Sequence, residues 1–235
     1  MEPRVKLEQG TYKGRHYPPT PDRPKGLDIY LGIPYALSTA GEHRFRPARP
    51  VPVGLDHGGK EFGAAALGFI SPYTDSSAEA APSDEDCLSV NVVAPSSVRE
   101  RAEKGGSDEE GKLPVVVYFH GGAFNMGYGA DRDMSSYVTH AGDIIAVSFN
   151  YRLGALGFLP SKAVVKDGGR EALNLGLGDQ RVALKWVERN IEAFGGDVRR
   201  VSVMGISAGA HSVGLPLLPR LGIVETDETD WTSPS

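Results

Sequence analysis

The chain has 235 residues, which is enough for one large domain, and a formal net charge of −5. This acidic balance provides no basic surface for nucleic acid, and no apolar stretch approaches membrane-spanning length. The N-terminus lacks the apolar core of a signal peptide, and the single cysteine, Cys87, cannot form an intrachain disulfide. We therefore expect no nucleic-acid partner, no membrane span and a cytoplasmic, reducing location.

A polar stretch from Ser96 to Lys112 carries many acidic and basic residues. Runs of mixed charge are usually solvated surface segments. We predict a loop here, inside one domain and without a function of its own.

An apolar strand is predicted over Val115–Phe119, and the loop His120–Phe124 follows it directly. By itself, such a loop is more often a tight turn between two elements. Upstream of a nucleophilic serine, adjacent glycines would let backbone N–H groups approach the oxyanion of a tetrahedral intermediate. Gly121 and Gly122 are therefore the candidate oxyanion donors of this loop.

Two further elements follow along the chain. The apolar run within Asp143–Gly154 predicts a parallel strand that is buried on both faces. Over Asp179–Phe194, apolar residues recur at spacings of four, four and three, which predicts an amphipathic helix ending at Gly195. Strands and a helix in this order are typical of the parallel sheet of an α/β fold.

The segment Val201–Gly209 joins an apolar strand to the pattern Gly-x-Ser-x-Gly, with Ser207 at its centre. With 30 glycines in the chain, chance alone would give this pattern roughly one time in four, so its neighbours must support it. A sharp strand-to-helix turn exposes a serine hydroxyl to a base and to a substrate carbonyl. Gly205 and Gly209 suit that turn because a Cβ there would clash with backbone, and the N–H of Ala208 would complete the oxyanion hole.

Taken together, these segments resemble the type-B carboxylesterase family, which also holds cholinesterases and certain fungal lipases. The matching motifs occur in family order over about residues 5–215: Gly32–Ala36, Glu85–Val92, His120–Phe124, Asn150–Phe158, Gly178–Arg181 and Ala193–Asp197. The resemblance implies an α/β-hydrolase fold, with a mostly parallel central sheet and flanking helices, truncated after the nucleophile turn. It assigns residues 1–215 to the N-terminal part of the domain and leaves 216–235 as a divergent tail, expected to be disordered.

The resemblance implies a serine carboxylic-ester hydrolase that works through an acyl-enzyme. Ser207 would be the nucleophile, and Gly121, Gly122 and Ala208 would form the oxyanion hole. The substrate would be a small-molecule or lipid-like ester. Neither the family nor the spacing of the histidines implies a cofactor, a metal or a specific protein partner.

The chain departs from the family pattern in several places. Ile206 stands where the family usually has Glu, and Cys87 lacks the upstream cysteine with which its family counterpart commonly pairs. Only 28 residues follow Ser207, and their one histidine, His211, is expected on the helix surface rather than as a base. The catalytic acid and histidine are therefore expected to be missing from this chain. A non-catalytic, cholinesterase-like binding protein and a truncated inactive product are the alternative interpretations.

The strand before Ser207 should also lack one neighbour. In the α/β-hydrolase sheet it pairs with the strand before the oxyanion loop and, on its other side, with a later strand that is absent here. Val201–Met204 is therefore expected to be an open edge, uncharged and without proline, which favours self-association.

Overall fold

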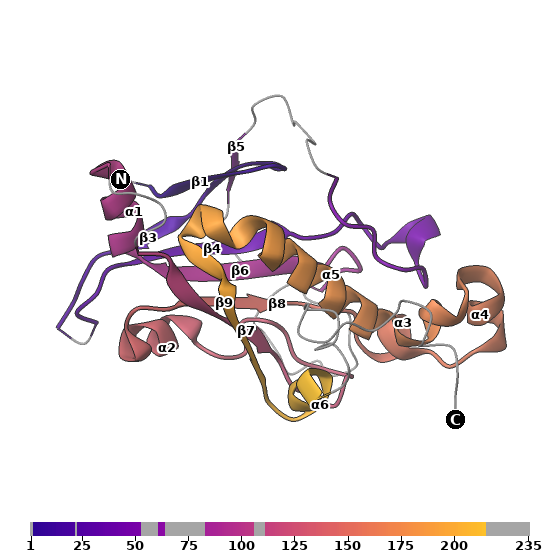
Figure 1. Cartoon of the computed structure of the whole chain (residues 1–235). Coiled ribbons are helices and arrows are strands. Elements are labelled where there is room, and N and C mark those ends of the chain that lie inside the picture. The colour runs from indigo at the N-terminus through magenta and orange to yellow at the C-terminus, as the bar shows by residue number, and fades with distance from the viewer. Residues whose placement is uncertain (1, 22, 53–60, 64–82, 106–110, 215–235) are drawn as a thin grey trace.

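The computed structural model describes residues 2–21, 23–52, 61–63, 83–105 and 111–214, which form two sheets flanked by helices (Figure 1). The strands are β1 (Arg4–Leu7), β2 (Gly10–Lys13), β3 (Arg15–Tyr17), β4 (Leu27–Pro34), β5 (Glu61–Gly63), β6 (Ser89–Pro95), β7 (Leu113–Phe119), β8 (Ile145–Phe149) and β9 (Gly196–Gly205). The helices are α1 (Ser96–Glu103), α2 (Met134–Ala141), α3 (Gly154–Phe158), α4 (Lys162–Gly168), α5 (Leu175–Asn190) and α6 (Ala208–Gly214). Short 3₁₀ turns are η1 (Gly41–His43), η2 (Arg170–Asn174) and η3 (Ile191–Phe194). The tail over 216–235 lies outside the described residues.

The larger sheet has the strand order β3-β4-β6-β8-β7-β9. β7 pairs in parallel with both β8 and β9, whereas β3, β4, β6 and β8 pair antiparallel in succession. The predicted α/β fold class is confirmed. Within the described residues the sheet is mixed, and its parallel part is the β8–β7–β9 half that ends at the predicted serine turn.

Alternate residues of the parallel strands face opposite sides of the sheet, as the two-residue period of a strand requires. On one face, Val117 of β7 and Val147 of β8 lie in the main core with Val187 of α5. On the other face, Tyr118 and Ala146 pack in a second cluster with α2. The sheet is thus buried between α5 and α2, which lie on its two sides in Figure 1.

The predicted helix over 179–194 is confirmed as α5 followed by η3. It begins four residues earlier than predicted, and its last turn tightens to 3₁₀ geometry. Gly195 ends it in the left-handed conformation, with a φ of 79°, as the glycine stop predicts.

The loop predicted over 96–112 is wrong for its first half, which forms α1. Arg99 of this helix donates from Nε to the buried carboxylate of Asp28 at 2.7 Å, and its Nη1 lies 3.1 Å from the Glu103 carboxylate one turn later. The Ser96 backbone N–H bonds to the Gly26 carbonyl. Within this charged segment, Arg99 pairs with Glu103 at i,i+4 and with the distant Asp28. The composition of the segment does not predict these contacts.

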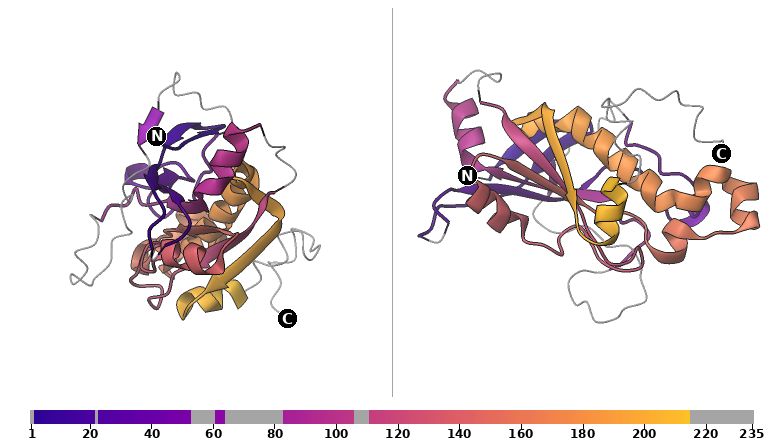
Figure 2. Two further views of the ribbon diagram at one scale, coloured as in Figure 1. Left: turned by 90° about the vertical axis from the view of Figure 1, so that its left-hand side faces the viewer. Right: turned by 60° about the horizontal axis from the view of Figure 1, so that its bottom comes forward.

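Within the described part of the chain, β9 has β7 as its one neighbour and forms an edge of the sheet (Figure 2). This agrees with the open edge expected from the sequence, while the self-association expected from it stays a prediction. Cys87 forms no disulfide and is fully buried, as predicted for a small apolar residue. Among the described residues, no helix combines the length and apolarity of a membrane span, and no three metal-ligating side chains cluster.

A buried ion pair ties the chain after β8 to the first turns of α5. Arg152 binds the Asp179 carboxylate with Nε at 2.8 Å and Nη2 at 2.6 Å, and the Arg152 backbone N–H donates to it at 3.0 Å. The two side chains are 3% and 0% exposed, so neither charge can be solvated if its partner is lost.

We predict that Asp179→Asn lowers the free energy of unfolding by about 3–5 kcal/mol, because it leaves the Arg152 charge buried without its counter-ion. Asp143→Asn is the matched control, since the Lys25–Asp143 pair is exposed and such pairs contribute about 1 kcal/mol or less. Denaturant titration measures both variants. Equal losses would contradict the special role of the buried pair.

Candidate active site

Ser207 lies in the turn between β9 and α6, with its side chain exposed. Its φ is +53°, a left-handed conformation that costs a non-glycine residue about 1–2 kcal/mol. Close backbone packing at Gly205 and Gly209, which flank Ser207 in the sequence, enforces this turn. A Cβ on Gly205 would lie 2.5 Å from the Gly209 carbonyl carbon, and one on Gly209 would lie 2.8 Å from the His120 carbonyl oxygen and overlap the Phe119 carbonyl. Both glycines are therefore needed where the sequence predicts them.

The first turn of α6 leaves backbone donors without an acceptor among the described residues. The Gly209 N–H donates to the Ile206 carbonyl at 2.8 Å and the His211 N–H to the Ser207 carbonyl at 3.0 Å. The N–H of Ala208 donates to no acceptor among the described residues, as expected for the first turn of a helix. It lies directly after the serine, where the sequence analysis puts an oxyanion donor.

The glycine loop after β7 lies against the serine turn. A Cβ on Gly121 would be 3.3 Å from the Ser207 Cβ and 2.8 Å from the Ile206 carbonyl oxygen. Gly122 has a φ of +106°, and a Cβ on it would overlap the Met126 backbone. The structure therefore brings Gly121, Gly122, Ser207 and Ala208 together from β7 and β9, which are neighbours in the sheet.

The sequence does not predict two strained residues in this loop. Ala123 and Phe124 have φ values of +53° and +59°, so the loop holds three left-handed residues in succession after Gly121. Within the described chain, the N–H groups of Gly121, Gly122 and Ala123 have no acceptor. A positive φ at Ala or Phe has no sequence signature, because it is imposed by packing around the loop.

The side chain of His120 supports the glycine loop through a hydrogen bond and a ring contact. It is fully buried, its ring stacks on Tyr151 with centroids 4.2 Å apart, and its Nδ1–H donates to the Gly121 carbonyl at 2.8 Å. The Tyr151 hydroxyl donates to the His120 carbonyl at 2.9 Å. Burial lowers the pKa of His120 to about 4, so the ring is neutral and suits structural support better than proton transfer at neutral pH.

His211 occupies the position predicted for it on the surface of α6. Its Nδ1 lies 3.0 Å from the Ser207 backbone carbonyl, one helical turn back, and the side chain is exposed. None of the hydrogen bonds between described residues reaches the Ser207 hydroxyl. The described residues thus place an exposed serine beside backbone donors, without a base next to them.

Comparison with known proteins agrees with this geometry. The profile described as "Carboxylesterase family" matches residues 1–221. The chain belongs to the carboxylesterase family. It is 34% identical over 220 residues to a carboxylic ester hydrolase of Bombus ignitus, covering 93% of this chain and 36% of that protein. It is 40% identical over 196 residues to the para-nitrobenzyl esterase of Bacillus subtilis strain 168, covering 80% and 36%.

The solved structures agree with the sequence relatives. A thermophilic pNB esterase superimposes with a TM-score of 0.73 at 35% identity, over 91% of this chain and 40% of that one. This confirms the α/β-hydrolase fold predicted from the motifs. The chain thus spans little more than a third of the length of these carboxylesterase relatives.

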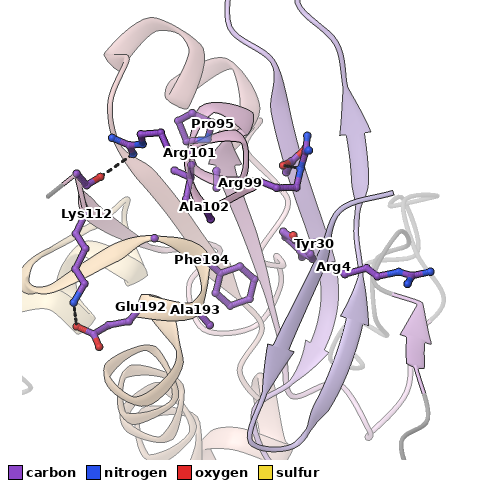
Figure 3. Close-up of a pocket in the computed structure, with 15 residues that line it drawn as sticks. Arg4, Tyr30, Pro95, Arg99, Arg101, Ala102, Lys112, Glu192, Ala193 and Phe194 are labelled. Carbon is purple, nitrogen blue, oxygen red and sulfur yellow. Dashed lines mark hydrogen bonds and ion pairs between the residues drawn. The ribbon is translucent and has the colours of Figure 1, made fainter. Parts of the chain in front are cut away.

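A hollow of this carboxylesterase-family chain lies between α1 and η3, with a cavity of about 180 Å³ (Figure 3). Its charged groups point to partners of their own rather than toward a common centre. Lys112 Nζ lies 2.8 Å from the Glu192 carboxylate, and Arg101 donates to the Gly111 carbonyl. The lining includes no residue of the glycine loop or of the serine turn, so this hollow is separate from the candidate active site.

We predict that Gly209→Ala destabilises the chain by about 3 kcal/mol, since the added methyl overlaps the backbone at the end of β7. Gly178→Ala is the matched control: that glycine lies in α5 with nothing within 4 Å of its would-be Cβ. Helix propensity should make Gly178→Ala stabilising by about 0.5–1 kcal/mol. Thermal and denaturant unfolding measure both, and similar effects would contradict the close approach.

His120 should make stability fall in acid. Because its pKa is about 4 in the folded chain against an ordinary 6.5, the unfolded chain binds an extra proton between these values. The stabilisation is complete above pH 6.5 and is lost as the pH falls toward 4, by at most about 3 kcal/mol.

We expect His120→Asn to flatten the pH dependence of unfolding over that interval. The exposed His140 provides the control, because His140→Asn should leave the slope as in the unsubstituted chain. Denaturant titrations at several pH values give the slopes. Parallel curves for His120→Asn and the unsubstituted chain would show that His120 is not the group responsible.

Proposed function

We propose that this chain carries the nucleophile and the oxyanion hole of a serine carboxylic-ester hydrolase. The observation that carries the proposal is the contact of Gly121 with Ser207. It sets a loop whose N–H groups have no acceptor among the described residues beside an exposed serine. Fixed donors of this kind stabilise a developing negative charge at little reorganisation cost. Membership of the carboxylesterase family supports the same reaction.

In the proposed reaction the Ser207 Oγ attacks the ester carbonyl carbon, and the carbonyl oxygen becomes an oxyanion held by the N–H groups of Gly121, Gly122 and Ala208. The bond to the alcohol oxygen then breaks and leaves an acyl-enzyme, which water hydrolyses to the acid. The Ser207 proton must pass to a base and from there to the leaving alcohol. No described histidine contacts the Ser207 hydroxyl, so we place the base and its acid outside the described residues.

The surroundings of the loop favour an apolar ester, small or lipid-like. Met126 and Ile206 are 41% and 45% exposed, and they are two of the three large apolar side chains exposed in the described chain. A Cβ on Gly122 would lie 3.0 Å from the Met126 Cγ, and one on Gly121 would lie 3.3 Å from the Ile206 Cγ2. Apolar side chains thus flank both glycines, next to the position where the ester carbonyl would bind.

We predict that the 235-residue chain turns over a short 4-nitrophenyl ester at only about 10³–10⁴ times the rate in water, with Ser207→Ala changing little. Joined to the remaining length of the Bacillus subtilis para-nitrobenzyl esterase, it should show strong turnover. Ser207→Ala should then reduce kcat on the order of 10⁶-fold.

An organophosphonate probe should label the joined protein at Ser207 alone, and Ser202→Ala, which removes an exposed serine of β9, provides the control for a nearby serine. Labelling at another serine, or turnover that survives Ser207→Ala in the joined protein, would remove the assignment. A well-folded joined protein with neither labelling nor turnover would favour a non-catalytic binding role or an inactive product.

In the same joined protein, we expect Met126→Ser and Ile206→Ser to lower kcat/KM for a hexanoate ester on the order of tenfold relative to the acetate ester. Tyr137→Ser is the matched control, because Tyr137 is the third exposed apolar side chain and lies on α2. Unchanged chain-length preference in both loop variants would separate these side chains from the substrate.

A further inference from the structure

We propose that Gln180 is a positioning residue for the nucleophile turn. It acts through a buried chain of hydrogen bonds that runs from Gln180 on α5, through Ser212, to the Ala208 carbonyl on α6. The catalytic meaning of this chain rests on the proposed function, whereas its effect on the position of α6 does not.

The series of hydrogen bonds is short, and both of its side chains are fully buried. Gln180 Nε2 donates to the Ser212 Oγ at 3.0 Å, and the Ser212 hydroxyl donates to the Ala208 carbonyl at 3.1 Å. Gln180 and Ser212 are both 0% exposed. Water cannot replace either bond without opening the contact between α5 and α6.

The direction of these hydrogen bonds decides which group must donate to the Ser212 oxygen. A serine hydroxyl has a single hydrogen, which here goes to the Ala208 carbonyl, so the group that meets its lone pair must be a donor. The amide nitrogen of Gln180 supplies that donor. The other polar atom of the amide, Gln180 Oε1, has no partner among the described residues. The amide of Gln180 is therefore engaged through its N–H group. A side chain without an N–H at position 180 would leave the Ser212 oxygen buried and unsatisfied.

Two attachments on the buried face of α6 then define where this helix lies. Gly209 packs directly on the backbone at the end of β7. Gln180 of α5 donates to Ser212, one helical turn beyond Ala208. Gln180 is itself rigidly placed, because the neighbouring Asp179 is bound by the buried Arg152. The first turn of α6, with Ser207 before it, is therefore fixed both to the sheet and to α5.

Hydrogen exchange, followed by mass spectrometry on the full 235-residue chain, tests the proposal. Gln180→Met keeps the length of the side chain but removes the donor, and Ser212→Ala removes one oxygen atom. Each should speed exchange of the α6 amides on the order of fivefold to tenfold, the effect of one lost buried hydrogen bond. The double variant should go no further than either single one, and the amides of β7 and β8 should keep their protection.

Asn190→Leu is the matched control. Asn190 also lies on α5, is buried, and donates from Nδ2 to the Trp186 carbonyl at 2.9 Å. Its loss should lower the melting temperature without changing exchange in α6. If Gln180→Met misfolds, the milder Ser212→Ala decides the question.

Three outcomes would overturn the proposal: unchanged α6 exchange in Ser212→Ala, equal acceleration throughout the chain, or additive effects in the double variant. The rate of Ser207 labelling by an organophosphonate, measured on the joined protein, should fall in Gln180→Met and not in Asn190→Leu. Absence of labelling in the unsubstituted joined protein would count against the proposed function alone, because the exchange data still decide whether Gln180 positions α6.

Discussion

The close approach of α6 to the end of β7 is the constraint on which the candidate active site depends. Gly209 touches the carbonyl groups of Phe119 and His120, and no other residue type leaves room for this contact. It brings the turn that holds Ser207 beside the loop that begins at His120. Because β7 and β9 are neighbours in the parallel half of the sheet, both segments emerge at the same edge, as ligand-binding loops do in α/β folds.

Buried polar groups hold the rest of the site around that contact. Tyr151, just after β8, binds the His120 carbonyl and stacks on its ring, while Arg152 next to it binds Asp179 at the start of α5. One short segment thus anchors the glycine loop and α5, the helix whose Gln180 donates to Ser212 of α6. Such groups are costly to leave unpaired, so they favour one arrangement of the three elements over looser ones.

This arrangement brings a serine and backbone donors together without bringing a base to them. The described residues supply a strained, exposed serine and backbone donors whose N–H groups have no other acceptor within that part of the chain. The histidines near the serine are occupied otherwise: His120 is buried and neutral, and His211 bonds along its own helix. Within the described residues, the backbone donors are therefore fixed beside the serine, and no base contacts its hydroxyl.

The amino-acid sequence by itself determined the features that rest on local physics. Continuous apolar runs identified β7 and β8, the 3.6-residue period identified α5, and the steric need for glycine identified Gly205 and Gly209. Tertiary structure decided what depends on residues far apart in the chain. α1 forms because Arg99 reaches Asp28, Ala123 and Phe124 take left-handed conformations because the surrounding loop is packed, and Gln180 meets Ser212 only because α5 and α6 are brought together. Such contacts leave no periodic signal, since each depends on the whole chain placing two distant backbone segments side by side.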